Sequence, residues 1–179
     1  IYGAFAKTLS FMDGRSTAAE ESGSEEFEMD GHVVIMEYNE LAIEIADFYA
    51  KRGQQVLLLD LDPDITDYFK NQHGHSNIHA HYSNMADPDV WEDLAFNKAK
   101  IVISCMDGGQ DAEMAISRWL KKQAPDVPFI AATSSHEETL ELYEAGARYV
   151  IQTEYLAAKS FREIFEIEVS KPLKDAFRT

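Results

Sequence analysis

Short apolar runs alternate with amphipathic segments along the chain from Gly31 onward. The apolar runs are strand-sized and rich in β-branched residues, whereas the segments between them repeat apolar positions as helices do. The pattern predicts strands at residues 32–36, 55–60, 77–82, 100–105, 128–133 and 148–152. It predicts helices at 39–51, 62–69, from 87 onward, and at 110–123, 135–146 and 154–169. We therefore expect an α/β fold, a Rossmann-like, doubly wound parallel six-stranded sheet with helices on both faces.

Several of these helices have sequence signals at their starts. Asp62-Pro63 and Asp87-Pro88 each place a capping carboxylate before a proline at the first helical position. Ser135 begins a capping box. These local signals support the boundaries that the apolar pattern predicts.

The first 30 residues differ from the rest of the chain. Residues 1–12 form a short apolar and aromatic patch, and six of the eleven residues from Glu20 to Asp30 are acidic. Such a stretch buries too little apolar surface to offset its ordering entropy, so we interpret residues 1–30 as an N-terminal segment with a flexible acidic linker. We assign residues 31–152 to the Rossmann-like domain and 153–179 to a C-terminal helix and tail.

Composition narrows the function classes. The 32 acidic and 16 basic residues give a net charge of −16, which repels nucleic acids and anionic lipid surfaces. No apolar run approaches the ~20 residues of a membrane-spanning helix. Cys105 is the sole cysteine, so the chain forms no internal disulfide, and we expect a reducing compartment. The chain starts at Ile1 without a leader sequence, so we expect a piece of a longer protein.

The first strand-to-helix turn runs from Glu37 to Ala42, where a dinucleotide-binding turn reads G-x-G-x-x-G. Glu37 and Asn39 occupy the first two glycine places, and Ala42 is an accepted replacement for the third. Asp60 follows Asn39 by 21 residues, the distance at which such folds place the carboxylate that binds a ribose hydroxyl. The sequence therefore has the frame of a nucleotide site without its glycine-rich phosphate cradle.

The substituted turn predicts a weakened phosphate site. The Cβ of Asn39 blocks close approach of a ligand to the backbone, although asparagine tolerates a left-handed conformation. Glu37 and Glu40 bring negative charge toward a diphosphate, and one such contact at ~4 Å and an effective dielectric of ~20 costs about 4 kcal/mol. A helix N-terminus returns less than that. An adenosine-like ligand with little phosphate contact and an empty pocket are the alternatives.

Three segments and one turn together carry a family resemblance: HVVIMEYNELA, VLLLDLDPD, the Asp87-Pro88 turn, and VPFIAATSSHEETLELYEAGARYVIQTEYLAAK. In this order they resemble the RCK (regulator of potassium conductance) or TrkA-N domain. The resemblance is strongest to the cytoplasmic domain of Kef-type antiporters, of the monovalent cation:proton antiporter-2 family, and it covers about residues 31–165. The opening IYGAFAKTLSF resembles the segment that leaves the last transmembrane helix of those transporters.

The resemblance implies a regulatory, ligand- or pH-sensing domain on the cytoplasmic side of an integral membrane transporter for potassium or another monovalent cation. Its implied partners are the membrane domain of the same polypeptide, a second copy of the chain and an adenine nucleotide such as AMP or NAD, with no nucleic acid. The implied cofactor-binding positions are Tyr38, Asn39, Glu40, Asp60, Leu61 and Asn84. Ser83-Asn84 replaces the family's Gly-Asp, and Thr153 replaces its proline, so the cofactor stays open and nucleotide binding is expected to be weakened.

The predicted final helix has apolar residues on more than one side, among them Leu156, Phe161, Ile164 and Phe165. This distribution predicts burial against two surfaces, one of them a partner subunit in a homodimer. Ordinary packing of the helix on its own sheet is the alternative.

Histidines gather at one place in the chain, at His73, His75, His79 and His81. A pH-responsive patch and a divalent metal site are two interpretations of this cluster. Polar residues at a sheet edge are the simpler one.

Other reactive side chains have simple interpretations too. Asp60, Asp62 and Asp64 alternate as in a calcium loop, yet the glycine and the closing glutamate of such a loop are missing, and a helix start explains Asp62 better. Asp107-Gly108-Gly109 is interpreted as a flexible lid or as a turn. Cys105, at a strand end, is interpreted as an inert core thiol.

Two other functional classes share parts of this pattern. A phospho-receiver domain resembles the chain around VLLLDLD, but Asp60 and Thr133 lie 73 residues apart and Gln152-Thr153 replaces the expected Lys-Pro. An NAD(P)-dependent oxidoreductase needs an intact glycine turn and a catalytic Tyr/Lys pair in the crevice, whereas Tyr155 and Lys159 lie on the terminal helix. We therefore predict a domain without enzymatic activity.

Overall fold

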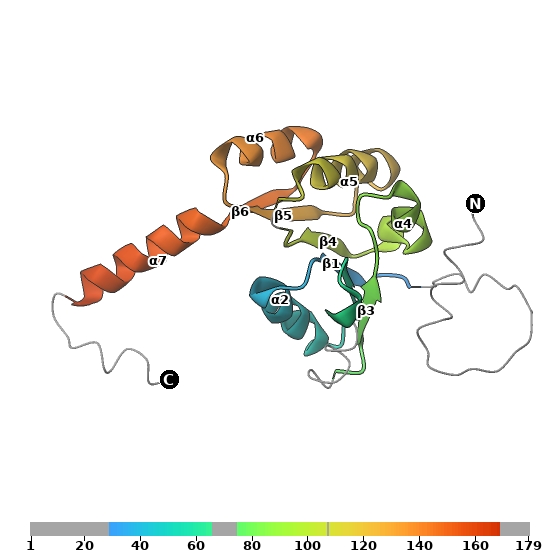
Figure 1. Cartoon of the computed structure of the whole chain (residues 1–179), viewed down its shortest axis with the longest axis horizontal. Coiled ribbons are helices and arrows are strands. Elements are labelled where there is room, and N and C mark those ends of the chain that lie inside the picture. The colour runs from blue at the N-terminus through green and yellow to red at the C-terminus, as the bar shows by residue number, and fades with distance from the viewer. Residues whose placement is uncertain (1–28, 66–74, 107, 169–179) are drawn as a thin grey trace, which may run out of the picture.

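The computed structural model describes residues 29–65, 75–106 and 108–168. Its centre is a six-stranded parallel sheet with the order β3-β2-β1-β4-β5-β6 (Figure 1). The strands are β1 Val33–Met36, β2 Val56–Asp60, β3 Ile78–Tyr82, β4 Ile101–Ser104, β5 Phe129–Thr133 and β6 Tyr149–Gln152. The predicted doubly wound fold is confirmed, and every predicted strand is present.

The strand order separates two of the functional alternatives. Phospho-receiver domains have the order 2-1-3-4-5, whereas this sheet has the dinucleotide-binding order 3-2-1-4-5-6. The receiver-like alternative is therefore wrong. In the observed order the connections reverse direction between β1 and β4, so the ligand crevice of such a sheet lies outside the carboxyl ends of these two strands.

Helices cover both faces of the sheet (Figure 1). They are α2 Glu40–Ala50, α4 Pro88–Asp93, α5 Gln110–Gln123, α6 His136–Ala145 and α7 Thr153–Glu168, with a 3-10 turn at Phe96–Lys98. Val33 and Ile35 of β1 pack with Ala42 and Ala46 of α2. The alternate side chains of β1 pack with α4, α5 and α6 on the other face. Burial on both faces explains why the central strands are continuous apolar runs.

The predicted helix starts are present. The side chains of Asn39, Asp87 and Ser135 accept hydrogen bonds from backbone N–H groups in the first turns of α2, α4 and α6. Helix α6 ends at Gly146, where φ is 125°, a conformation that side chains with a Cβ rarely adopt. The helix predicted from Asp62 begins as expected at residues 63–65, and its remainder lies outside the described residues.

The final helix leaves the body of the domain. Helix α7 follows β6 directly and runs away from the sheet (Figure 1). All its side chains from residue 153 to residue 166 are exposed, including Phe161 at 61% and Phe165 at 66%. The alternative that this helix packs on its own sheet is therefore wrong, and its apolar side chains have no cover within the described chain.

The edge strand β3 carries two of the clustered histidines, His79 and His81. The Nε2 atom of His79 lies 2.9 Å from Gln55 Oε1, and the Nε2 atom of His75 lies 3.4 Å from a carboxylate oxygen of Asp47. His79 and His81 therefore lie at a sheet edge, as the simpler interpretation expects. His73 lies outside the described residues.

Candidate functional site

The carboxyl ends of the central strands meet at the point where the sheet changes direction. Met36, the last residue of β1, pairs with Leu59 of β2 on one side and with Ser104 of β4 on the other. The turn after β1, the residues after β2 and the loop after β4 are therefore neighbours. The predicted site residues all lie at this edge of the sheet.

The turn after β1 keeps a glycine-like backbone without a glycine. Glu37 has a φ of 70°, in the left-handed region that glycine adopts readily and other residues rarely adopt, and its N–H donates to the carbonyl of Leu59 at 2.8 Å. Asn39 is extended, with a φ of −150°, so the left-handed conformation that asparagine tolerates is not used there. The first glycine place thus retains its backbone conformation while it carries a negatively charged side chain.

The side chain of Asn39 closes part of the crevice. Its Nδ2 donates to the carbonyl of Cys105 after β4 at 2.8 Å, and its Oδ1 accepts from the N–H of Ala42 at 3.0 Å. One amide therefore joins the two loops that face each other across the switch point and also caps α2. This bridge is the structural counterpart of the predicted loss of the phosphate cradle, because the side chain of Asn39 stands where the family has a glycine.

Asp60 is nearly buried, with an exposed fraction of 8%, and it holds the turns around it. Its Oδ2 accepts from the N–H of Tyr38 at 2.8 Å, and its Oδ1 accepts from the N–H of Asp62 at 2.7 Å. A carboxylate has about four acceptor positions, so each oxygen keeps one further position. Asp60 and Tyr38 are thus brought together as predicted positions of one site.

The remaining predicted residues lie at the surface, at the same edge of the sheet as Asp60. Glu40 and Leu61 are exposed in the first turn of α2 and directly after β2. Asn84 follows β3, and its Oδ1 accepts from the N–H of Ala86 at 3.1 Å, which makes a local turn. The backbone holds this turn in place because the N–H of Ser83 donates to the carbonyl of Asp60 at 2.8 Å. These residues share one edge of the sheet, whereas the side chain of Asn39 turns toward β4.

Sequence reasoning missed a buried acid, Glu113, in the first turn of α5. Its exposed fraction is 3%, and burial raises its pKa from 4.5 to about 7. The negative charges of Glu138 and Glu37 raise this pKa further, while a hydrogen bond with Ser104 opposes the rise. The signal was present in the sequence, because Glu113 has the helical spacing of Ile116 and Leu120, the buried stripe of α5.

Cys105 is buried next to this acid. Burial raises the pKa of its thiol to about 12, with smaller contributions from the charges of Glu37 and Glu113. A thiol with such a pKa stays protonated at neutral pH, and the thiolate is the nucleophile. The interpretation of Cys105 as an inert core thiol agrees with this environment.

Glu138 connects the crevice to the start of α7. The hydroxyl of Thr133, at the end of β5, donates to the carboxylate of Glu138. The hydroxyl of Thr153, the first residue of α7, donates to the carbonyl of Thr133 at 3.4 Å. The end of β5 is therefore hydrogen-bonded both to Glu138 and to the first residue of the helix that leaves the domain.

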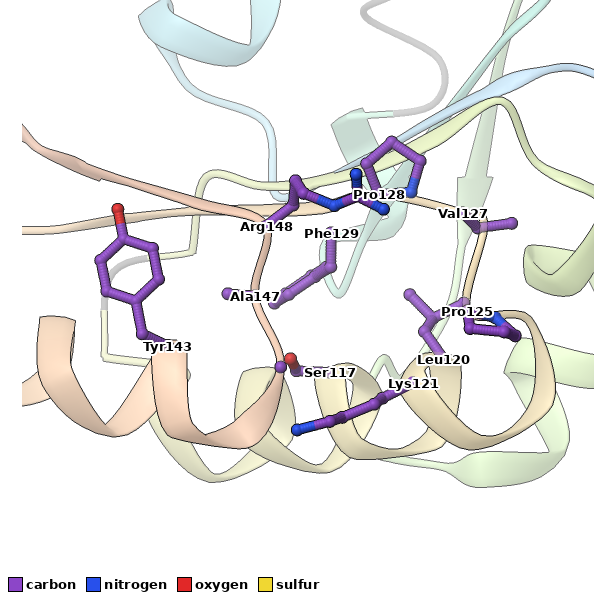
Figure 2. A pocket seen from close by; sticks show the side chains of 11 residues that line it. Ser117, Leu120, Lys121, Pro125, Val127, Pro128, Phe129, Tyr143, Ala147 and Arg148 are labelled. Carbon is purple, nitrogen blue, oxygen red and sulfur yellow. The ribbon is translucent and has the colours of Figure 1, made fainter.

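A cavity of about 220 Å³ lies at the opposite edge of the sheet (Figure 2). It is bounded by α5, α6 and the starts of β5 and β6, and Lys121 and Arg148 are among its lining residues. The aliphatic part of Lys121 lies against Gly146, where a Cβ would approach to 2.8 Å. None of the predicted site residues lines this cavity, so it is separate from the crevice.

The aspartates that alternate after β2 form a helix start. The Oδ1 of Asp62 accepts from the N–H of Asp64 at 2.9 Å, as expected of a capping residue. Within residues 29–65, 75–106 and 108–168, no three His, Cys, Asp or Glu side chains are grouped to hold a metal ion. In the same part of the chain, no helix is both long and apolar enough to cross a membrane. Gly108 and Gly109 lead into α5, and Asp107 lies outside the described residues.

The family model of the TrkA-N domain matches residues 33–153. The chain therefore belongs to the TrkA-N domain family, as the resemblance predicted. No curated protein matches the chain.

Solved structures of this family share the fold. The TrkA-N domain of the inner membrane protein ybaL from Escherichia coli has a TM-score of 0.68 and 18% identity, covering 76% of this chain and 98% of that domain. The Kef CTD of Shewanella denitrificans, in an AMP-bound form, has a TM-score of 0.64 and 15% identity, covering 78% of this chain and 82% of that one. The GsuK channel bound to NAD has a TM-score of 0.62 and 15% identity, covering 83% of this chain and 25% of that one.

Proposed function

We propose that the chain is a non-enzymatic regulatory domain of a Kef-type antiporter for potassium or another monovalent cation, and that it binds an adenine nucleotide on the cytoplasmic side of the membrane. Membership of the TrkA-N family supports a regulatory domain of cation transport. The similar structures include a Kef domain with AMP and a channel with NAD. The observation that carries the proposal is Asp60, which is fixed at the end of β2 by Tyr38 and keeps acceptor positions for a ribose.

The crevice favours the nucleoside part of such a ligand over its phosphates. Asp60 accepts the ribose hydroxyls, and Leu61 and Asn84 flank the adenine from the ends of β2 and β3. The phosphates meet the carboxylates of Glu37 and Glu40 and the bridge that Asn39 makes to Cys105. We therefore expect adenosine and AMP to bind at least as tightly as NAD, the reverse of an intact glycine turn.

A thermal-shift series with adenosine, AMP, ADP and NAD tests this function. A ligand at a hundred times its dissociation constant stabilises the fold by about 2.7 kcal/mol. Asp60→Ala should abolish the shift, whereas Asp93→Ala, at an exposed position of α4, should leave it unchanged. A shift that survives in Asp60→Ala would place the ligand elsewhere, and the absence of any shift would refute nucleotide binding.

The domain also forms a homodimer through α7 in this proposal. The apolar side chains of α7 are exposed on a helix that leaves its own sheet, and the rings of Phe161 and Phe165 stack with centroids 6.3 Å apart. A second copy covers this surface and places two regulatory domains side by side beneath the two membrane domains. Light scattering should find a species of twice 20.2 kDa.

The dimer is tested by one charge substitution. Phe165→Glu should give a monomer, because it places a charge in the apolar contact, whereas Arg162→Glu on the same helix should stay dimeric. A wild-type chain that remains monomeric at high concentration would contradict the dimer.

A further inference from the structure

A buried carboxyl group lies next to the proposed nucleotide site, in the first turn of the helix that follows β4. Glu113 projects from the first turn of α5, its exposed fraction is 3%, and its Oε1 has no hydrogen-bond partner. The hydroxyl of Ser104, the last residue of β4, is hydrogen-bonded to the same carboxyl group. A buried carboxylate with one unpaired oxygen is unfavourable, and a proton on that oxygen removes the charge.

The groups that face Glu113 make the ionised form less favourable still. Glu37 comes from the turn after β1 and Glu138 from the first turn of α6, and both carboxylates repel a charge on Glu113. Ser104 at the end of β4 and Cys105 directly after it lie beside Glu113, and the thiol of Cys105 stays neutral. The N-terminus of α5 favours an anion, but a helix end has a smaller effect than burial does.

We propose that Glu113 is a proton-binding site whose occupation controls how well the crevice accepts the phosphates of a nucleotide. The inference rests on the proposed function, because a nucleotide at the switch point brings its phosphates to the turn that contains Glu37. A protonated Glu113 leaves one negative charge fewer in the crevice. At about 10 Å and an effective dielectric of about 25, removing one such repulsion changes affinity about tenfold.

The protonated carboxyl also acts on the start of α7. Glu138 repels a charge on Glu113 and accepts the hydroxyl of Thr133, and Thr133 in turn bonds to Thr153 at the first position of α7. A change of charge at Glu113 therefore reaches a hydrogen-bonded group at the root of the helix that leaves the domain. The crevice thereby senses pH and nucleotide together.

Calorimetric titration of the 179-residue chain with NAD at pH 6 and pH 8 tests the coupling. NAD is the probe because its diphosphate keeps the same charge across this range, and adenosine is the uncharged control. We expect NAD to bind about fivefold more tightly at pH 6 than at pH 8, because the tenfold coupling is not fully expressed between these two pH values. Adenosine should bind equally at both. Buffers of different ionisation enthalpy should report uptake of up to about half a proton per NAD at pH 7.

Three variants test whether Glu113 causes the pH dependence of NAD binding. Glu113→Gln should abolish the pH dependence of NAD binding, whereas Glu92→Gln, at an exposed position of α4, should retain it. Ser104→Ala removes the hydrogen bond that favours the ionised form, so it should move the midpoint to higher pH. Equal NAD affinity at the two pH values, or the same pH dependence in Glu113→Gln, would overturn the coupling.

A second readout separates this inference from the proposed function. If no adenine compound binds at either pH, the proposed function fails and so does the coupling to phosphates. The carboxyl ¹³C titration of Glu113 in the free chain then decides the proton site alone. A midpoint near neutral pH keeps that site, and a midpoint near that of a free glutamate overturns it.

Discussion

The two helices that begin beside the switch point, α2 on one face of the sheet and α5 on the other, have opposite arrangements at their N-termini. Helix α2 is capped by Asn39, and its first residue, Glu40, is exposed to solvent. Helix α5 follows Gly109, which provides no side-chain cap, and its first turn buries Glu113. The first arrangement satisfies backbone donors and places an acid where the helix dipole and water both favour its charge. The second places an acid where burial disfavours the charge. One side of the crevice is stabilised, and the other responds to protons.

Replacing the buried acid Glu113 should have the largest effect on stability. Burial raises the pKa of Glu113 from 4.5 to about 7, so between these pH values the folded chain holds a proton that the unfolded chain has lost. The contribution of Glu113 to the free energy of unfolding therefore falls as pH rises through that window. The loss is complete above about pH 7. Glu113→Gln should be more stable than the wild type by about 3 kcal/mol at pH 8 and equally stable near pH 4.

Urea denaturation across this pH range measures the difference. Glu40→Gln provides the comparison on α2, because its side chain is exposed and its replacement should change stability little at any pH. If the difference in unfolding free energy between Glu113→Gln and the wild type does not vary with pH, Glu113 does not titrate as proposed.

Removing the cap of α2 should lower the stability of the chain, whereas replacing Glu113 should raise it. Asn39→Ala loses the cap and the bridge to Cys105, and caps of this kind contribute about 0.5–2 kcal/mol. We expect a loss of about 2 kcal/mol at all pH values by thermal or urea unfolding, since two hydrogen bonds go. Asn84→Ala removes one exposed turn contact and should cost less than about 0.5 kcal/mol. Equal losses in the two variants would contradict the bridging role of Asn39.

Relieving the backbone strain at Glu37 should have the smallest effect on stability. Glu37→Ala and Glu37→Gly both remove the charge, but only glycine adopts a φ of 70° without strain. The glycine variant should therefore be more stable than the alanine variant by about 1 kcal/mol. Both should bind NAD more tightly than the wild type does. An alanine variant as stable as the glycine variant would show that the left-handed turn is not strained.

The parts that sequence predicted are those fixed by local pattern. The strands follow from apolar runs buried on both faces, and the caps at Asn39, Asp87 and Ser135 depend on bonds within one turn of helix. The bridge from Asn39 to Cys105 joins residues 66 positions apart, so no local rule reveals it. Likewise the strain at Glu37 is set by the sheet and not by the preference of glutamate.

The acid at Glu113 was open to prediction in part. Its spacing from Ile116 and Leu120 placed it on the buried stripe of α5, but only the fold brings Glu37 and Glu138 to the same place. Apolar residues on several sides of α7 predicted burial against two surfaces, whereas the described chain covers neither side of the helix. The identity of the ligand could not be predicted, because Asp60 indicates a ribose while the turn before α2 repels a phosphate.

The central claim, an adenine nucleotide at the carboxyl edge of β1, β2 and β3, is tested most directly by amide chemical shifts in ¹⁵N-labelled chain titrated with AMP. The account predicts saturable shifts at Tyr38, Leu61 and Asn84, and their loss in Asp60→Ala. Shifts confined to the cavity around Lys121 and Arg148, or no saturable shifts at all, would contradict it.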